Sequence, residues 1–223
     1  MHPLWQIEGP SLLWIQVNLR QDWLTPIMQV ITRFGDGGIF WIGFCILLLC
    51  IPKSRRTGIA ASLSLALNGL VTNACLKNII GRIRPYVRFP ELTVLTTIPS
   101  DSSFPSGHTA ASFAVAAGVY MAGWKKTGVV LYVFSGVIGF SRIYLGVHFP
   151  SDVIGGAVVG VLCAWVARKF IVLAGKTQKV QKKGRKRKYS CFSVCWKYIN
   201  DCRSSVLHRY VNGCCRSAVP RYI

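Results

Sequence analysis

Residues 141–152, SRIYLGVHFPSD, place side chains suited to phosphate chemistry between two apolar segments. His148 and Asp152 are four residues apart, and Pro150 can begin a helix with Asp152 in its first turn. This spacing lets the Asp152 carboxylate accept a hydrogen bond from one His148 ring N–H, so that the other nitrogen becomes a better nucleophile. Arg142 adds a fork of donors that suits phosphate. The alternative is an ordinary loop, with a solvated His148 and with Asp152 serving only the helix dipole.

A second stretch, FPSGHTAASF, predicts the start of a helix with an anion site. Pro105 suits the first turn, Ser106 is a good N-cap residue, and Gly107 lets the backbone approach a ligand closely. Free N–H groups at this end of a helix bind anions, and His108 lies beside them. The alternative is a plain helix cap next to a surface histidine.

A third stretch, KNIIGRIRP, carries three cations, Lys77, Arg82 and Arg84. Lys77 and Arg84 are seven residues apart, which is two helical turns, so both side chains can point to one face. Two permanent cations on one face repel each other unless an anion lies between them. The alternative is that both side chains snorkel to lipid headgroups.

The elements that must position these side chains are apolar. The chain is 52% hydrophobic and 15% charged, with a mean hydropathy of +0.40, which is too apolar for an average soluble domain. Apolar runs separated by short polar breaks indicate an integral membrane protein, an all-α polytopic helical bundle with about five to six transmembrane helices.

Five spans are expected, at about 37–51, 57–80, 106–123, 127–143 and 151–172. Two short amphipathic helices should precede them and lie at the interface, with Trp5, Trp14 and Trp23 as anchors. The alternative for residues 11–33 is a single tilted span, which would bury several polar side chains. The domains are therefore an amphipathic N-terminal segment (1–35), a membrane-embedded domain (36–172) and a basic, cysteine-containing tail (173–223).

The basic breaks between the spans predict the topology. They fall on one side if the helices alternate, and the positive-inside rule makes that side cytoplasmic: Lys53, Arg55, Arg56, Lys125, Lys126, Arg168 and Lys169. The loops 81–104 and 144–150 then face outward. Arg82, Arg84 and Arg88 break the rule there, and a function such as anion binding best explains them.

The tail holds most of the positive charge. Residues 168–223 contain 15 of the 27 Lys and Arg residues and one acid, so 14 of the 20 net positive charges lie there. This pattern favours a cytoplasmic tail attracted to anionic lipid headgroups over a nucleic-acid partner, and a solvated tail is the alternative. The spacing of its five cysteines matches no zinc motif.

The expected topology brings the three stretches to one outer membrane face. Their joint inventory of cations, N–H groups, two histidines and an aspartate is what metal-free phosphoryl transfer needs. Cations and N–H groups neutralise the phosphate oxygens, one histidine attacks phosphorus, and the other protonates the leaving oxygen.

These stretches resemble a known family. Lys77 to Pro85 fits K-x6-R-P, residues 105–108 read PSGH, and residues 141–152 fit S-R-x5-H-x3-D. In order, spacing and every motif residue, they are similar to the three signature motifs of the type-2 phosphatidic acid phosphatase family, the lipid phosphate phosphatases. The resemblance covers roughly residues 35–172 and is to compact bacterial members.

The resemblance implies a metal-independent enzyme without a cofactor, in the cell membrane, with its site on the extracytoplasmic face. His148 would form a phosphohistidine, Asp152 would orient it, and His108 would be the general acid. The residues that would hold the phosphate are Lys77, Arg84, Ser106, Gly107 and Arg142.

The expected function is therefore an integral membrane phosphatase or diphosphatase acting on a membrane lipid phosphate. Likeness to the compact bacterial members favours undecaprenyl or another polyprenyl diphosphate as substrate. Phosphatidate, phosphatidylglycerol phosphate and phosphorylated glycolipids are alternatives. A lipid phosphotransferase and a non-catalytic membrane scaffold are further alternatives, although the intact motifs argue against the scaffold.

Overall fold

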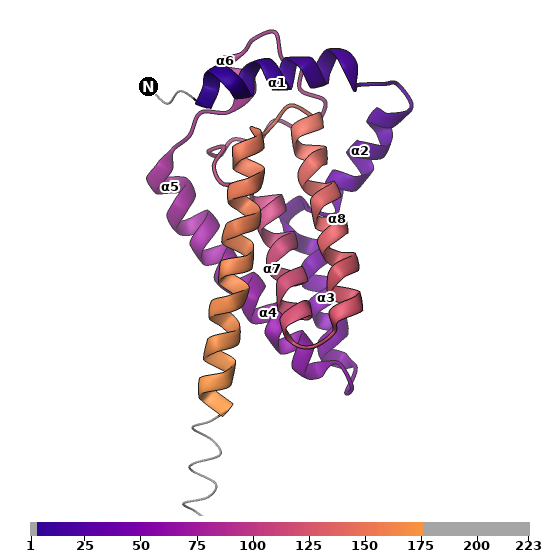
Figure 1. The fold of residues 1–223 in the computed structure, drawn as a ribbon, viewed down its shortest axis with the longest axis vertical. Helices are drawn as coiled ribbons and strands as arrows, with labels where there is room; N and C mark the ends of the chain where they lie inside the picture. The colour runs from indigo at the N-terminus through magenta and orange to yellow at the C-terminus, as the bar shows by residue number, and fades with distance from the viewer. Residues whose placement is uncertain (1–3, 176–223) are drawn as a thin grey trace, which may run out of the picture. The chain divides into compact units, whose positions relative to one another are not determined.

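Helices account for every regular element in residues 4–175, the part of the chain that the computed structural model describes (Figure 1). In chain order these are α1 (Leu4–Asn18), α2 (Leu24–Arg33), η1 (Asp36–Gly38), α3 (Ile39–Cys50), α4 (Arg55–Gly69), η2 (Leu70–Leu76), α5 (Lys77–Ile80), α6 (Pro85–Arg88), α7 (Gly107–Met121), α8 (Lys125–Tyr144) and a last described helix, Pro150–Gly175. The predicted all-α class is confirmed. The basic tail from residue 176, with its cysteines and its expected attraction to anionic lipids, lies outside the described residues.

All five predicted helices are present, but they differ in how well they suit a membrane. Among the described residues, the stretches Arg55–Arg88, Lys125–Tyr144 and Pro150–Gly175 are long and apolar enough to span. A fourth candidate is α2 together with Asp36–Cys50, which are bent by 41° at a short break. α7 has 15 residues, fewer than the roughly 20 that cross a bilayer directly. The sequence predicted five to six spans, and three or four of the described helices are long and apolar enough to be spans.

The N-terminal residues form two helices rather than the single span over 11–33. Arg20 lies at the break, where its Nε donates to the carbonyl of Tyr144 (3.0 Å) and its Nη1 to the carbonyl of Thr93 (2.8 Å). These bonds fasten α1 and α2 to the end of α8, and Figure 1 shows α1 lying across that end of the bundle.

The two N-terminal helices differ in their apolar surface. α2 is amphipathic as predicted, burying Met28 and Thr32. α1 buries Leu12 but exposes Trp14 and Val17, so it is apolar on more than one face rather than amphipathic. Such an exposed apolar surface suits contact with lipid.

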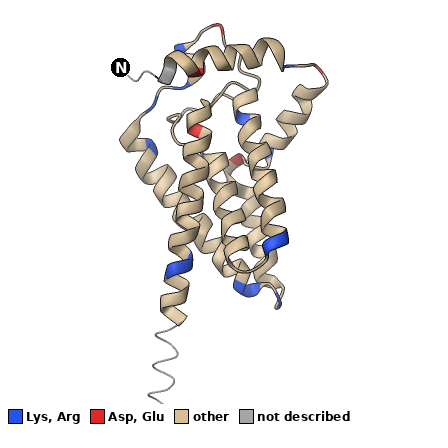
Figure 2. Cartoon of the chain, viewed as in Figure 1, with Lys and Arg blue, Asp and Glu red and all other residues tan. Residues whose placement is uncertain are grey.

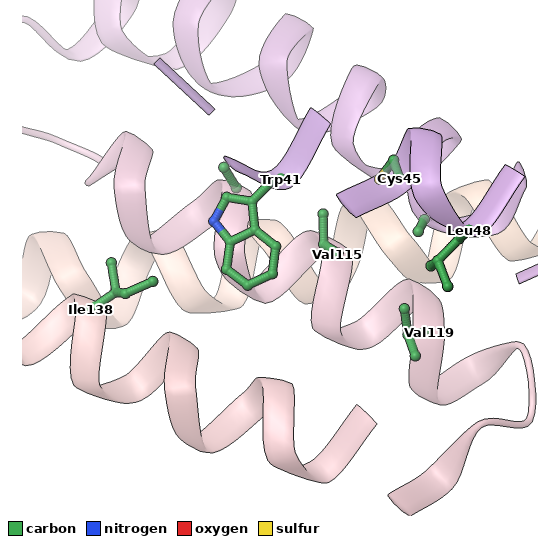
Figure 3. Packing of buried hydrophobic residues seen from close by; sticks show 8 residues of the cluster. Trp41, Cys45, Leu48, Val115, Val119 and Ile138 are labelled. Atoms are coloured by element: carbon green, nitrogen blue, oxygen red, sulfur yellow. The ribbon is translucent and has the colours of Figure 1, made fainter. Parts of the chain in front are cut away.

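The core forms around α7, whose small residues let neighbouring helices approach closely. A Cβ on Gly160 of the last described helix would lie 2.4 Å from the Ala110 carbonyl oxygen, so that crossing requires glycine. Figure 3 shows α3, α7 and α8 contributing side chains to one apolar cluster. Its buried members are Trp41, Cys45, Leu48, Ala61, Ala111, Val115, Val119 and Ile138.

The second span contains an irregular turn. η2 is a π-helix inserted between α4 and α5, so the helix from Arg55 to Ile80 is wider at residues 70–76. Single π-turns inside α-helices are frequent at functional sites. Lys77 follows η2 directly.

Charge is distributed unequally over the bundle. Figure 2 shows the acidic residues gathered in the half that holds α1, whereas Lys and Arg occur at both ends. The three predicted motifs lie in the half that holds the acids. That half therefore combines many cations with nearby carboxylates, and its contacts define the candidate site.

Candidate active site

The three predicted stretches meet around one cavity of about 680 Å³. Six of the eight predicted residues line it: Lys77, Arg84, Gly107, His108, Arg142 and His148. The other two, Ser106 and Asp152, are fully buried and lie outside the cavity lining in the described part of the chain.

His148 lies in the loop between α8 and the last described helix, and its side chain is only 2% exposed. Its Nε2 is 3.4 Å from Nη1 of Arg84, and its Nδ1 is 3.5 Å from Oδ2 of Asp152. Burial, together with the charges of Arg84 and Arg142, lowers the pKa of His148 to about 4, and the Asp152 carboxylate only partly opposes this lowering. The ring is therefore neutral at neutral pH, as a nucleophile must be.

Asp152 lies behind His148 and is held by several donors. Its Oδ2 accepts hydrogen bonds from the Phe149 N–H (2.9 Å) and from the hydroxyl of Ser103. Its Oδ1 accepts one from Nη1 of Arg82 at 2.6 Å. The predicted proximity to His148 is present, but 3.5 Å exceeds the length of a well-formed hydrogen bond. Asp152 thus fixes the loop through its hydrogen bonds and faces the His148 imidazole at a distance slightly longer than a hydrogen bond.

His108 lies in the first turn of α7 and is paired with a different carboxylate, that of Asp36. Nε2 of His108 is 2.8 Å from Oδ1 of Asp36, which belongs to η1. Gly35 packs against the ring, because a Cβ there would lie 2.4 Å from Cδ2 of His108. The side chain of His108 is half-buried at 20% exposure, whereas that of Asp36 is 58% exposed, so water reaches the pair from the Asp36 side.

Two of the cations predicted to hold phosphate pair with a carboxylate of the protein itself. Lys77 and Arg84 both form ion pairs with the carboxylate of Asp101. Arg84 also donates from Nη1 to the Val147 carbonyl (3.0 Å), which fixes its guanidinium beside His148. The third cation, Arg142, donates from Nη1 to the hydroxyl of Thr32 at 2.6 Å.

Asp101 is a strongly acidic group at this site. Burial acts to raise the pKa of its carboxyl, but hydrogen bonds and charges from Lys77 and Arg84 outweigh burial and lower the pKa to about 2. The carboxylate is therefore charged at neutral pH. It occupies donors of Lys77 and Arg84 that a phosphate group would use.

The start of α7 differs from its prediction in one respect. Ser106 is the N-cap residue, but its side chain makes no capping hydrogen bond, and its hydroxyl accepts one from Thr109 Oγ1 at 3.0 Å. Its N–H donates to the Asp152 carbonyl at 3.0 Å, which joins the second motif to the third. Gly107 approaches Lys77 closely, because a Cβ there would lie 3.4 Å from Nζ. The Ser106 hydroxyl is thus a packing group in this structure rather than part of the cavity wall.

Arg82 also differs from its prediction as a binder of an external anion. Its guanidinium pairs with two carboxylates of the protein itself, those of Glu8 and Asp152, each at 2.6 Å. The acceptors lie 74 and 70 residues away along the chain, so the sequence pattern did not reveal them.

Comparison with known proteins identifies this arrangement. The profile of the PAP2 superfamily matches residues 57–176, about half of the chain. The chain belongs to the PAP2 superfamily. Undecaprenyl-diphosphatase BcrC of Bacillus subtilis is 33% identical to it over 149 residues, which are 66% of this chain and 75% of that protein.

Further PAP2 relatives support the same assignment. Phosphatidylglycerophosphatase B of Bacillus subtilis is 33% identical over 169 residues, covering 69% of this chain and 78% of the relative. The crystal structure of Aquifex aeolicus LpxE matches with a TM-score of 0.65 and 26% identity, over 73% of this chain and 95% of the other. The chain is thus a PAP2-type membrane phosphatase, a hydrolase of phosphate esters.

Three carboxylates near the PAP2 motifs were absent from the sequence prediction. Asp36 reaches His108, Asp101 bridges Lys77 and Arg84, and Glu8 reaches Arg82. A sequence search for acids in the outward-facing segments would have found all three, because each lies in a stretch on that side of the expected topology.

Proposed function

We propose that this chain removes phosphate from a lipid phosphate or diphosphate through a phosphohistidine at His148, with a polyprenyl diphosphate as its leading substrate. The observation that carries the proposal is the two-part lining of the cavity. One part is formed by Lys77, Arg84, His108, Arg142 and His148, and the other by apolar or small residues of α3 and α4, namely Ile42, Cys45, Ile46, Leu65, Ala66 and Gly69.

The apolar part is suited to a hydrocarbon chain that continues into the bilayer. Ile42 and Ile46 line the cavity, yet both are exposed on the outer surface of α3. A lipid can therefore place its phosphate at the cations while its chain leaves between α3 and α4. This shape favours amphiphilic substrates over soluble phosphate esters, because apolar burial stabilises only the lipid.

The chemistry follows from the positions of the two histidines. Nε2 of His148 attacks phosphorus, so that a P–N bond forms as the P–O bond of the leaving group breaks. His108 gives its proton to the leaving oxygen, while Lys77, Arg84 and Arg142 neutralise charge on the phosphoryl oxygens. Water then attacks the phosphohistidine and gives its proton to His108, the P–N bond breaks to restore His148, and inorganic phosphate leaves.

Asp101 competes with the substrate in this scheme. Its carboxylate and the phosphate group require the same donors on Lys77 and Arg84. Substrate binding therefore displaces the Asp101 carboxylate or makes it share these donors.

The distribution of charge supports an extracytoplasmic site. Lys53, Arg56, Lys126 and Arg168 lie in or beside the breaks away from the motifs, as cytoplasmic residues do under the positive-inside rule. The catalytic cavity then opens toward the outer leaflet. We extend the same proposal to the tail, whose lysines and arginines would bind anionic headgroups of the inner leaflet.

Phosphatidylglycerol phosphate is the second candidate substrate. Phosphatidylglycerophosphatase B matches this chain at the same identity as BcrC and over a similar share of it. The apolar lining accepts both kinds of chain.

Phosphate release by the purified full-length chain from a panel of lipids tests the proposal. The panel holds undecaprenyl diphosphate, phosphatidylglycerol phosphate, phosphatidate and a soluble phosphate ester, each with and without EDTA. We expect the polyprenyl diphosphate to be turned over best, EDTA to have no effect, and His148→Ala to release no phosphate. Preference for the soluble ester, full sensitivity to EDTA or an active His148→Ala would each contradict the proposal.

A further inference from the structure

Arg82 links the N-terminal helix to the carboxylate behind His148. Its Nη1 donates to Oδ1 of Asp152 and to the hydroxyl of Ser151, both at 2.6 Å, and its Nη2 donates to Oε2 of Glu8 at 2.6 Å. The guanidinium carbon also lies 4.4 Å from the ring centroid of Phe149. The Arg82 side chain thus contacts Phe149, Ser151 and Asp152.

Glu8 is the second member of this link and comes from α1. It is 7% exposed, and its Oε1 accepts a hydrogen bond from the Ser151 N–H at 2.8 Å. Ser151 is in the first turn of the last described helix, where N–H groups have no partner within the helix. Glu8 therefore caps the helix that carries Asp152, and its negative charge is favourable at that helix end.

The charges of Glu8 and Arg82 determine how strongly the negative charge of Asp152 acts on His148. Asp152 is fully buried, and Arg82 is 13% exposed. Interactions between charges in such surroundings are stronger than in water. An Arg82 paired with Asp152 alone would draw that carboxylate away from His148. A second carboxylate on Arg82 balances its charge and leaves Asp152 Oδ2 facing the imidazole.

The reaction makes this balance important. When His148 attacks phosphorus its ring gains positive charge, and Asp152 Oδ2, at 3.5 Å from Nδ1, is the carboxylate that faces it. A more negative Asp152 stabilises this charged ring, whereas Arg82 without Glu8 would oppose it.

We propose that Glu8 and Arg82 are positioning residues for the phosphoryl-transfer step, and that they act on His148 through Asp152. The inference rests on the proposed role of His148 as the nucleophile. It makes α1, which precedes the matched residues 57–176, a working part of the catalytic machinery. Neither residue lines the cavity in the described structure, so neither is expected to contact the substrate.

The test compares Glu8→Gln with Asp22→Asn in the full chain. Gln keeps the shape and one acceptor of Glu8 but removes its charge. Asp22 is an exposed acid of the same N-terminal segment and serves as the matched control. We expect Glu8→Gln to lower kcat about tenfold, the size typical of groups that support an active-site side chain. KM should not change, because Lys77, Arg84 and Arg142 are untouched.

A double-mutant cycle shows whether Glu8 acts through Arg82. Arg82→Gln leaves Glu8 unpaired, and the double variant removes both charges together. We expect the double variant to lose less activity than the product of the two single losses, because a shared pathway is not additive. Glu8→Asp keeps the charge and should recover part of the lost kcat. If Glu8→Gln does not fold, kcat of Glu8→Asp is compared with that of wild type instead.

The outcomes separate this inference from the proposed function. If His148→Ala releases no phosphate but Glu8→Gln keeps the wild-type kcat, the positioning role is wrong and the proposed mechanism stands. A rise in KM at constant kcat, or strictly multiplicative losses in the cycle, would also overturn it. An active His148→Ala would overturn both.

Discussion

The two histidines of the site lie in opposite surroundings. His148 is buried, and its carboxylate, Asp152, is fully buried and held by donors from three other residues. His108 is partly open, and its carboxylate, Asp36, is more than half exposed. The difference matches the two proposed tasks, because a nucleophile needs fixed, dry surroundings and a general acid must exchange protons with water.

The largest expected effect concerns the open histidine. Replacing His108 by Ala should slow hydrolysis of an alkyl phosphate lipid by about 10²- to 10⁴-fold, the usual contribution of a general acid. The loss should be much smaller for an aryl phosphate, whose leaving oxygen needs no proton. The measurement is kcat for both substrates, and equal losses would show that His108 does not protonate the leaving group.

Replacing the buried carboxylate, Asp152, should reduce kcat more than replacing the exposed one, Asp36. Asp152→Asn should lower kcat by about 10²-fold, because a buried charge facing His148 is lost. Asp36→Asn should lower it about tenfold or less, since water screens an exposed carboxylate. Both variants are measured under one condition, with Asp22→Asn as control. A greater loss from Asp36→Asn would reverse the comparison between the two histidines.

The acid limit of activity tests the burial of His148. The neutral ring is the proposed nucleophile, and its pKa of about 4 lies below the ordinary 6.5. Activity should therefore persist as the pH falls below 6.5 and decline only as it passes through about 4. The measurement is kcat/KM against pH, with unfolding followed in parallel. An acid limb centred near 6.5 would mean that His148 is solvated.

The smallest expected effect concerns the carboxylate between the cations. The folded-state pKa of Asp101, about 2, lies below its ordinary 3.8, so its stabilising contribution is present above 3.8 and is lost as the pH falls toward 2. Because the side chain is 47% exposed, the contribution is about 1 kcal/mol or less. Asp101→Asn should lower the Tm slightly at neutral pH, and the difference from wild type should shrink in acid. A constant difference across this range would contradict the assignment.

The sequence predicted the helices and the cations because both depend on local patterns. Apolar runs separated by polar breaks located the five helices, and the spacing of Lys77 and Arg84 indicated that both cations point to one place, where Asp101 pairs with them. The cavity brings six of the motif residues together, while their catalytic roles stay predictions.

What the sequence did not predict depends on contacts between distant residues. Asp36 meets His108 across 72 positions, and Glu8 meets Arg82 across 74. No periodicity encodes such pairs. The hydroxyl of Ser106 was misjudged for the same reason, because its orientation toward Thr109 depends on how α7 packs.

The π-turn η2 affects the direction in which the Lys77 side chain leaves the second span. Each residue of a regular helix advances the side-chain direction by about 100°. Each residue of a π-helix advances it by less, so converting Leu70–Leu76 to a regular α-helix of the same length would keep the hydrophobic character of the span but rotate Lys77 relative to the residues before it. The direction of the Lys77 ammonium group toward the cavity therefore depends on this local widening of the helix.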